Sequence, residues 1–299
     1  VGLTAVLLSI LWIQDQFSYD NYYHLKKDIY KIWTKTQDDG YTYTNDIVAG
    51  PMSEAINEEF PEVLEAGRIY WSQEKLITYS DKKIKIKGNQ IDESFVRIFD
   101  FPLSKGSKNN ILKDESSIAV TRSIADAIFG NEDPIGKVVK LDDENPYTVT
   151  AVLEDLPSNT DFDFTFLIKL PEEETASNDW NTNTYYSFVL LKPNTDIDQF
   201  NKKILGFVKK HAPERTKTDM FLYPMSKMHL FSKFENGVSV GGKIEDVRLI
   251  VIISGIILLI ACINFINLST ARSQKRAKEV GVRKVIGAQK SSLIKQFLF

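Results

Sequence analysis

The segment between Gly130 and Lys137 comes nearest to a phosphate-binding loop. In Gly130-Asn-Glu-Asp-Pro-Ile-Gly136-Lys137, five residues separate the glycines, whereas a phosphate-binding loop has four. Val138 stands where a magnesium-binding hydroxyl is required, and Pro134 has no backbone N–H to donate to a phosphate. Glycine supplies positive φ at β-turns. The segment therefore predicts a turn and no nucleotide site.

The other reactive side chains form no catalytic set in the sequence. The three histidines, His24, His211 and His229, are too dispersed for a local metal motif. Asp161 and Asp163 alternate with phenylalanines, as acids on the exposed face of a strand do, whereas hydrolytic carboxylates must be buried and face each other. No serine lies in a nucleophile-elbow context. We therefore expect no enzyme activity, metal or cofactor in this chain.

Residues 249–268 have the composition of a membrane-spanning helix. The first fifteen carry no charge and one hydroxyl, that of Ser254, and the next five extend the run to twenty. A helix rising about 1.5 Å per residue needs roughly 20 apolar residues to cross the hydrocarbon layer. Asn264 and Asn267 share one helix face, where they either bind another helix or mark the boundary of the membrane. Small residues would let another helix approach closely: Ser254, Gly255 and Ala261.

The charge distribution gives this helix an orientation. Residues 270–299 hold eight bases and one acid, a net of +7, so the other 269 residues must sum to −10 for the total of −3. Basic residues directly after a span stay on the cytoplasmic side. The acidic remainder argues against binding of nucleic acid. The lone cysteine, Cys262, excludes an intramolecular disulfide.

The N-terminal residues 1–13 are apolar but too short to span a membrane alone, and no small-residue cleavage site follows them. We interpret them as the end of a first span, and the chain as a fragment of a longer membrane protein.

The region between the two apolar segments alternates strands with helices. Residues 30–36 predict a strand buried on one face only, with Ile32 on one side and Lys31, Trp33 and Lys35 on the other. Asp196 or Thr195 would cap a helix. The strand–helix–strand order occurs twice, which predicts an α+β domain whose two βαβ halves form one split ferredoxin-like subdomain. The first half covers residues 30–36, 46–60 and 63–80, and the second covers 185–192, 196–211 and 220–225. A second α/β unit lies between them, at about residues 83–170.

Residues 275–288 predict a short amphipathic helix after the span. Val282, Val285 and Ile286 form a small apolar face. Gly281 would allow a break after the long helix, and Gly287 could end the short one in a left-handed conformation. Such a helix suits docking in a protein groove, and lipid-surface binding is as compatible with the bare pattern.

Several motifs together resemble a known family, the FtsX-like ABC transporter permeases of the MacB type. The C-terminal motifs are Asn264-Phe-Ile-Asn-Leu-Ser-Thr-Ala-Arg272 and Arg276-Ala-Lys-Glu-Val-Gly-Val-Arg-Lys-Val-Ile-Gly-Ala288. The extramembrane motifs resemble a MacB-like periplasmic core domain: Phe17-Ser-Tyr-Asp20, Asp28-Ile-Tyr30, Phe99-Asp-Phe-Pro-Leu103, Phe129-Gly130, Asp133-Pro-Ile-Gly-Lys137, Tyr147-Thr-Val-Thr-Ala-Val152, Asp155-Leu-Pro157 and Met228-His-Leu230.

The resemblance implies a multi-pass permease of the inner (cytoplasmic) membrane with four spans. The chain would hold the end of the first span (1–13), the periplasmic core domain (14–246), the second span (247–268) and a cytoplasmic loop with the start of the next helix (269–299). The core domain would have porter-like halves at about 22–82 and 184–230 around the inserted subdomain.

The resemblance also implies partners and a mechanism. ATP would be bound by a separate ABC ATPase, whose closure would push a coupling helix and so move the periplasmic domain, for export or lipoprotein release. Glu279, Arg283 and Lys284 would be polar contacts with the ATPase, and Val285 would belong to the same element, shaped by bends at Gly281 and Gly287. The permease would act as a homodimer or heterodimer, with a possible periplasmic adaptor and outer-membrane channel.

Two other readings stay open from the sequence. The first is a regulatory permease of the same architecture, which controls cell-wall hydrolases or a response to antimicrobial peptides. The second is a membrane-anchored sensor whose basic tail leads to a signalling domain. Two further spans after Phe299 would favour a permease, and a cytoplasmic output domain would favour the sensor.

Overall fold

The computed structural model describes residues 2–286, which divide into two units. One unit combines the N-terminal residues up to Asp15 with the chain from Glu245 onward, and the other is the continuous segment Gln16–Ile244. The sequence placed the limits of the periplasmic core domain at residues 14 and 246.

A four-stranded antiparallel sheet organises one half of the unit 16–244. Its strand order is β4-β12-β1-β13, and each strand is antiparallel to its neighbours. Each strand–helix–strand half contributes two strands. The bounds are β1 (Ile29–Asp38), α2 (Pro51–Glu59) and β4 (Val63–Ile69) in the first half, and β12 (Asn183–Leu191), α6 (Ile197–Lys203), α7 (Phe207–His211) and β13 (Thr218–Pro224) in the second. Short strands extend the sheet: β2 (Tyr41–Asn45) beside β1 and β3 (Ile47–Ala49) beside β12.

Helices α2, α6 and α7 supply apolar side chains to a common core with the sheet. Ile32 of β1, Met52 of α2 and Phe200 of α6 are buried in one cluster, where Phe60 lies against both Phe200 and Phe207. Asp196 caps α6, as expected, by accepting hydrogen bonds from the backbone N–H groups of the second and third residues after it. Capping and burial of one face together fix these short helices on the sheet.

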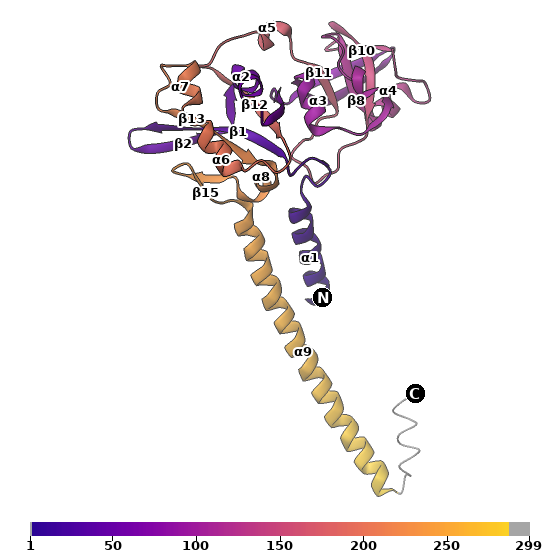
Figure 1. Cartoon of the computed structure of the whole chain (residues 1–299). Helices are drawn as coiled ribbons and strands as arrows, with labels where there is room; N and C mark the ends of the chain where they lie inside the picture. The colour runs from indigo at the N-terminus through magenta and orange to yellow at the C-terminus, as the bar shows by residue number, and fades with distance from the viewer. Residues whose placement is uncertain (1, 287–299) are drawn as a thin grey trace. The chain divides into compact units, whose positions relative to one another are not determined.

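Six strands form a closed ring in the other half of the unit. The pairing runs β5-β6-β11-β8-β10-β9 and returns to β5, with parallel pairs between β6 and β11 and between β8 and β10. Figure 1 shows β8, β10 and β11 close to helix α4. Side chains such as Ile77, Val120 and Phe166 are buried in one cluster with Phe129 of α4, which makes a small filled barrel. The bounds are β5 (Gln73–Tyr79), β6 (Lys82–Ile91), β8 (Ser117–Thr121), α4 (Arg122–Phe129), β9 (Val138–Leu141), β10 (Asn145–Leu153) and β11 (Phe166–Lys169).

The boundary of the inserted unit differs from the prediction. The strand over residues 63–80, which was expected to be broken near Gln73-Glu74, is two strands, because β4 ends at Ile69 and β5 starts at Gln73. β4 pairs with β12, whereas β5 pairs with β6 and β9 of the ring. The chain therefore enters the inserted unit at residues 70–72, about ten residues earlier than the expected limit at 82.

Aromatic side chains join the sheet to the barrel half. Phe95 and Phe99 of α3 (Glu93–Phe99) have ring centroids 4.6 Å apart, and Phe99 lies 5.1 Å from Phe188 of β12. Gly67 of β4 permits this approach, since a Cβ there would lie 2.6 Å from the backbone nitrogen of Phe95. Aromatic pairs contribute roughly 0.5–1.5 kcal/mol each beyond their burial.

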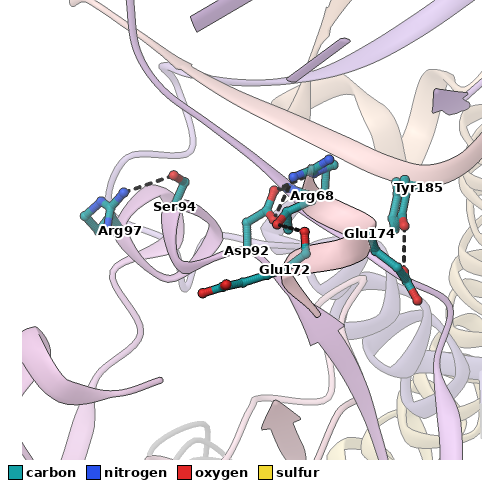
Figure 2. Close-up of polar contacts among 8 residues, drawn as sticks. Arg68, Asp92, Ser94, Arg97, Glu172, Glu174 and Tyr185 are labelled. Carbon is teal, nitrogen blue, oxygen red and sulfur yellow. Dashed lines mark hydrogen bonds and ion pairs between the residues drawn. The ribbon is translucent and has the colours of Figure 1, made fainter. Parts of the chain in front are cut away.

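One buried ion pair connects the same two halves. Arg68 of β4 binds Asp92, which follows β6, through Nε–Oδ2 at 2.8 Å and Nη2–Oδ1 at 3.2 Å (Figure 2). Asp92 Oδ2 also accepts the backbone N–H of Arg68 at 2.9 Å. Tyr185 covers the guanidinium with its ring and donates its hydroxyl to Glu174. A bidentate pair of this kind is geometrically specific, so it fixes where the barrel joins the sheet.

The remaining short elements connect these parts. They are β7 (Leu103–Gly106), η1 (Lys108–Asn110), α5 (Glu172–Thr175), α8 (Met225–Phe231), β14 (Lys233–Glu235) and β15 (Val238–Gly241).

The other unit contains α1 (Gly2–Ser18, up to Asp15) and most of α9 (Lys243–Val285), which Figure 1 shows as one unbroken helix. Among the described residues, α9 is the one helix long and apolar enough to cross a membrane. The two helices approach closely near Ala261, because a Cβ on Gly2 would lie 2.8 Å from the Cβ of Ala261. Ala261 thus serves as one of the small contact residues expected from the sequence.

Helix α9 is longer than predicted. It continues from residue 268 through the expected loop to Val285, and the break expected at Gly281 is absent. Gly281 has no positive φ, and a Cβ there would meet no atom within 4 Å. One glycine lowers helix stability by about 1 kcal/mol relative to alanine, which the long helical segment around it tolerates. Gly287 lies outside the described residues.

Candidate functional site

The predicted coupling residues lie along the last turns of α9. Glu279 and Val285 are exposed, and the side chain of Val285 is 89% accessible. The backbone of Arg283 and Lys284 is helical. An exposed apolar side chain beside basic residues leaves a surface on which a partner could dock.

The predicted packing residues of the span, Asn264 and Asn267, are both exposed on α9. Within the described residues, neither forms a side-chain hydrogen bond, so their role in binding a second helix stays a prediction. Ser254 differs, because its hydroxyl donates to the backbone oxygen of Ile250 at 2.7 Å. A hydroxyl in a membrane helix is satisfied in this way without a partner helix.

The domain 16–244 contains a cavity that the sequence did not indicate. Its volume is about 570 Å³, within the range of small-molecule sites. It lies on the face of the sheet opposite helices α2 and α6, and reaches the loop before β11, helix α8 and the start of α9. Five aromatic side chains line it among charged and polar ones: Trp33, Trp71, Phe162, Tyr186 and Phe188.

Lys31 supplies a cation at this cavity. Its side chain is buried, its Nζ lies 2.5 Å from Asp46 Oδ2, and the same nitrogen is 3.9 Å from the ring centroid of Tyr186. Burial lowers the pKa of Lys31, while the Asp46 carboxylate opposes that shift. The carboxylate and the aromatic face thus hold the charge of a desolvated ammonium.

Trp33 carries a polar group without a partner. It follows Lys31 by two residues on β1, so both side chains lie on the same face of the sheet. The whole residue is only 8% exposed. Its indole Nε1 is buried and has no acceptor among the described residues. A buried N–H without an acceptor costs about 1–3 kcal/mol, which makes this group a candidate ligand contact.

Next to the cavity, a polar cluster joins helix α8 to the end of α1. His229 of α8 stacks on Tyr19 with ring centroids 3.4 Å apart, and its Nε2 lies 2.9 Å from Gln16 Oε1. His229 Nδ1 is 3.8 Å from Asp161 Oδ1. Burial, reinforced by the charge of Asp20, raises the pKa of Asp161 to about 6. The sequence suggested an exposed acid on a strand, but residue 161 belongs to no strand.

The same loop also binds the chain directly after α1. Thr160 donates to Asp20 Oδ1 at 2.7 Å and forms a hydrogen bond of 2.9 Å with the Tyr23 hydroxyl, while Asn159 donates to the Ser18 hydroxyl at 3.0 Å. This loop runs from the barrel strand β10 to β11. The end of α1 is therefore linked by side chains to the barrel half of the domain.

The sequence did not predict the cavity or the polar cluster beside it, because their residues are far apart along the chain. Asp20 and Asp161 belong to regions that no local motif connects. The alternation over residues 30–36 suggested a strand with one buried face, whereas Lys31 and Trp33 are buried on the other face from Ile32. Tryptophan among the supposedly exposed residues was the available signal.

Two family models match this chain, one on each side of residues 207–250. The model described as MacB-like periplasmic core domain matches residues 1–206, and the one described as FtsX-like permease C-terminal matches residues 251–299.

Curated relatives share lower identity over the same region. The macrolide export ATP-binding/permease protein MacB of Mannheimia succiniciproducens is 27% identical over 195 residues, which cover 62% of this chain and 28% of that protein. The MacB of Campylobacter fetus is 23% identical over 75% of this chain and 34% of its own length. The chain thus spans about a third of the length of these relatives.

A solved structure supports the fold. It is a domain described as part of a permease protein from Porphyromonas gingivalis, with 23% identity and a TM-score of 0.58. The match covers 68% of this chain and 92% of that domain.

Proposed function

We propose the function from one premise: this chain belongs to the ABC transporter permeases that combine a MacB-like periplasmic core domain with an FtsX-like C-terminal region. It is accordingly a membrane protein with a periplasmic domain. The role that we propose is that of the transmembrane subunit which transmits ATP hydrolysis in a partner ATPase to movement of the periplasmic domain. The multi-pass topology of the inner membrane and a dimeric assembly belong to the same proposal.

The unbroken helix α9 carries the proposal. It starts two residues after β15 of the periplasmic domain and continues to Val285 among the predicted coupling residues. A helix of 43 residues rises about 65 Å, more than twice the thickness of the hydrocarbon layer. A displacement at its cytoplasmic end would therefore reach the periplasmic domain without an intervening flexible loop.

The fold supports this reading of the domain. The strand order β4-β12-β1-β13, with helices between the strands of each half, supports the proposal of a split ferredoxin-like subdomain in which the barrel would be the inserted subdomain. The hydrogen bonds of Asn159 and Thr160 connect the end of α1 to the loop that follows barrel strand β10. Movement of either helix end would thus act on a different part of the domain.

Export is the first candidate activity, because the curated relatives are named as macrolide export proteins. Lipoprotein release would use the same transmission. A regulatory permease that senses a ligand is the second candidate, and the cavity beside Lys31 is the observation that favours it. Periplasmic adaptors and an outer-membrane channel would follow from the export activity alone.

The test measures ATP turnover of the permease purified together with its ATPase. Glu279→Ala and Arg283→Ala should each lower the stimulated turnover by about fivefold, because a lost polar contact at an interface costs on the order of 1 kcal/mol. Arg248→Ala is the matched control on the same helix, close to the periplasmic domain, and should leave turnover unchanged. Unaltered turnover and unaltered co-purification in both test variants would remove the coupling assignment.

A further inference from the structure

Two nitrogen groups at the cavity are hydrogen-bond donors available to a ligand. The indole N–H of Trp33 has no acceptor in the described part of the chain. Lys243 lines the same cavity, and its ammonium forms no ion pair with a described residue, lying instead 5.8 Å from the Tyr19 ring centroid. Both groups can donate to a ligand without breaking an existing hydrogen bond.

Two of the three carboxylates at the cavity are already engaged in ion pairs, and the third has a raised pKa. Asp46 is paired with Lys31, and Asp163 is paired with Lys87. Asp161 lies beside His229 and next to Asp20, and its raised pKa makes it easier to neutralise than an ordinary aspartate. An anionic ligand would therefore meet less repulsion than the number of acids at the cavity suggests.

The walls favour an apolar body on this ligand. Trp71 and Tyr186 lie with ring centroids 5.4 Å apart, and Phe162 and Phe188 lie 5.8 Å apart, all at the cavity. Aromatic faces with a few placed polar groups are the usual composition of a small-molecule site. We propose that this cavity binds a small organic carboxylate with an aromatic or branched apolar body. The carboxylate would accept hydrogen bonds from Trp33 Nε1 and Lys243 Nζ.

Such a ligand would touch parts of the domain that lead to different membrane helices. Lys243 begins α9, whereas Phe162 belongs to the loop whose preceding residues bind the end of α1. A bound carboxylate would hold these segments together. This inference goes beyond the proposed ATPase coupling and does not depend on it, because binding is measured without ATP or the partner.

The experiment is isothermal titration of the full chain in lipid nanodiscs with three matched probes, after subtraction of empty nanodiscs. The probes are 3-phenylpropionate, 3-phenylpropan-1-ol and 3-phenylpropylamine, which share the aromatic body and differ in the charge of the head group. We expect saturable binding of the carboxylate, at least about tenfold tighter than that of the amine, because charged donors favour an anionic acceptor.

Two variants test the contacts. Trp33→Phe keeps the aromatic wall and removes only the donor, so it should weaken carboxylate binding by about fivefold. Lys243→Gln removes the charge of an exposed side chain without risk to the core, and should weaken binding to a similar extent. Trp180→Phe, in the core cluster beside α7, is the matched control and should bind as the unchanged chain does.

Absence of saturable binding by 3-phenylpropionate would overturn the proposal, as would tighter binding of the amine. If Lys243→Gln bound 3-phenylpropionate with unchanged affinity, Lys243 would not contact the carboxylate. This result would hold even if Trp33→Phe failed to fold. None of these outcomes bears on ATPase coupling, so failure here is distinguishable from failure of the proposed function.

Discussion

The backbone amide of Asp161 donates a hydrogen bond of 2.9 Å to Oδ1 of Asp20, which brings together two carboxyl groups 141 residues apart. Asp20 is buried in a left-handed conformation with φ of 58°, and its Oδ2 has no hydrogen-bond partner among the described residues. Burial raises the pKa of Asp20, as it does that of Asp161. The two carboxyl groups between the end of α1 and the loop after β10 therefore bind protons more tightly than exposed carboxyl groups do.

The unit 16–244 should fold without the rest of the chain. Its three buried clusters draw all their members from this segment. We expect the segment expressed alone in the periplasm to be soluble and monomeric, and to unfold cooperatively in urea, without ATPase activity. Aggregation of this segment under conditions that keep the full chain folded in detergent would contradict the prediction.

Stability of this segment should fall as the pH rises from about 4 to 6. The pKa of Asp161 is about 6 in the folded state and about 3.9 in an unfolded chain, so the folded state binds the extra proton in this window. Asp161→Asn should remove much of the decline. It should also raise the free energy of unfolding by about 1 kcal/mol at pH 7.5, less than the full shift implies, because solvent screens a partly exposed carboxyl.

Urea unfolding at pH 4 and pH 7.5 measures this effect. Asp163→Asn is the control two residues away, and it removes only an exposed ion pair with Lys87, with an expected change below about 0.5 kcal/mol. Equal destabilisation by both variants at pH 7.5 would refute the assignment to Asp161.

Removal of Arg68 should be strongly destabilising. Arg68→Ala leaves Asp92 without its bidentate partner, and loss of one member of a buried ion pair costs about 3–5 kcal/mol. Arg68→Lys keeps the charge without the fork, so it should cost less. Arg97→Ala, whose guanidinium pairs with Glu65 and Glu93 at an exposed site, should cost no more than about 1 kcal/mol per pair. Urea unfolding gives the change in the free energy of unfolding for all three variants. Equal losses in Arg68→Ala and Arg97→Ala would be inconsistent with a stabilising buried pair between Arg68 and Asp92.

Gly88→Ala should disrupt the barrel where it closes. Gly88 of β6 pairs with Phe166 of β11, and a Cβ at this position would lie 2.1 Å from the Phe166 backbone oxygen. Overpacking of this kind costs about 1–3 kcal/mol or more. In the Gly88→Ala variant, the amides of β11 should exchange faster than in the unchanged chain, whereas those of β13 should exchange at the same rate. Lys85→Ala, exposed on the same strand, should leave both rates unchanged.

Gly281→Ala tests whether α9 is continuous at Gly281, as the structure has it, or bends there, as the sequence suggested. If α9 is continuous when it works, alanine should preserve ATPase stimulation and stabilise the helix by about 1 kcal/mol. If a bend at Gly281 is needed, stimulation should fall. Gly281→Pro should lower stimulation if the helix is continuous, because proline in a helix interior costs about 3 kcal/mol. Loss of stimulation in Gly281→Ala alone would restore the sequence-based expectation of a break.

Local pattern predicted the parts of the fold that depend on local chemistry. The cap at Asp196 and the strand–helix–strand order were readable because capping and periodicity act over a few residues. The barrel was not readable, since its closure depends on the parallel pair β6–β11, whose residues Gly88 and Phe166 lie far apart in sequence. Alternation also misled at Lys31, where an ion pair and aromatic faces allow a charged residue to be buried.

The closed ring of strands has a consequence for how the domain can recognise other proteins. Each ring strand has a ring neighbour on both sides, so the ring itself offers no strand edge to which a foreign peptide could add by main-chain hydrogen bonds. In the sheet half, β2 pairs only with β1 and carries the exposed Tyr41 and Tyr43. A partner that binds the six ring strands would therefore contact their side chains, whereas main-chain pairing is open at strands with one neighbour, such as β2 beside the sheet and β7 beside the ring.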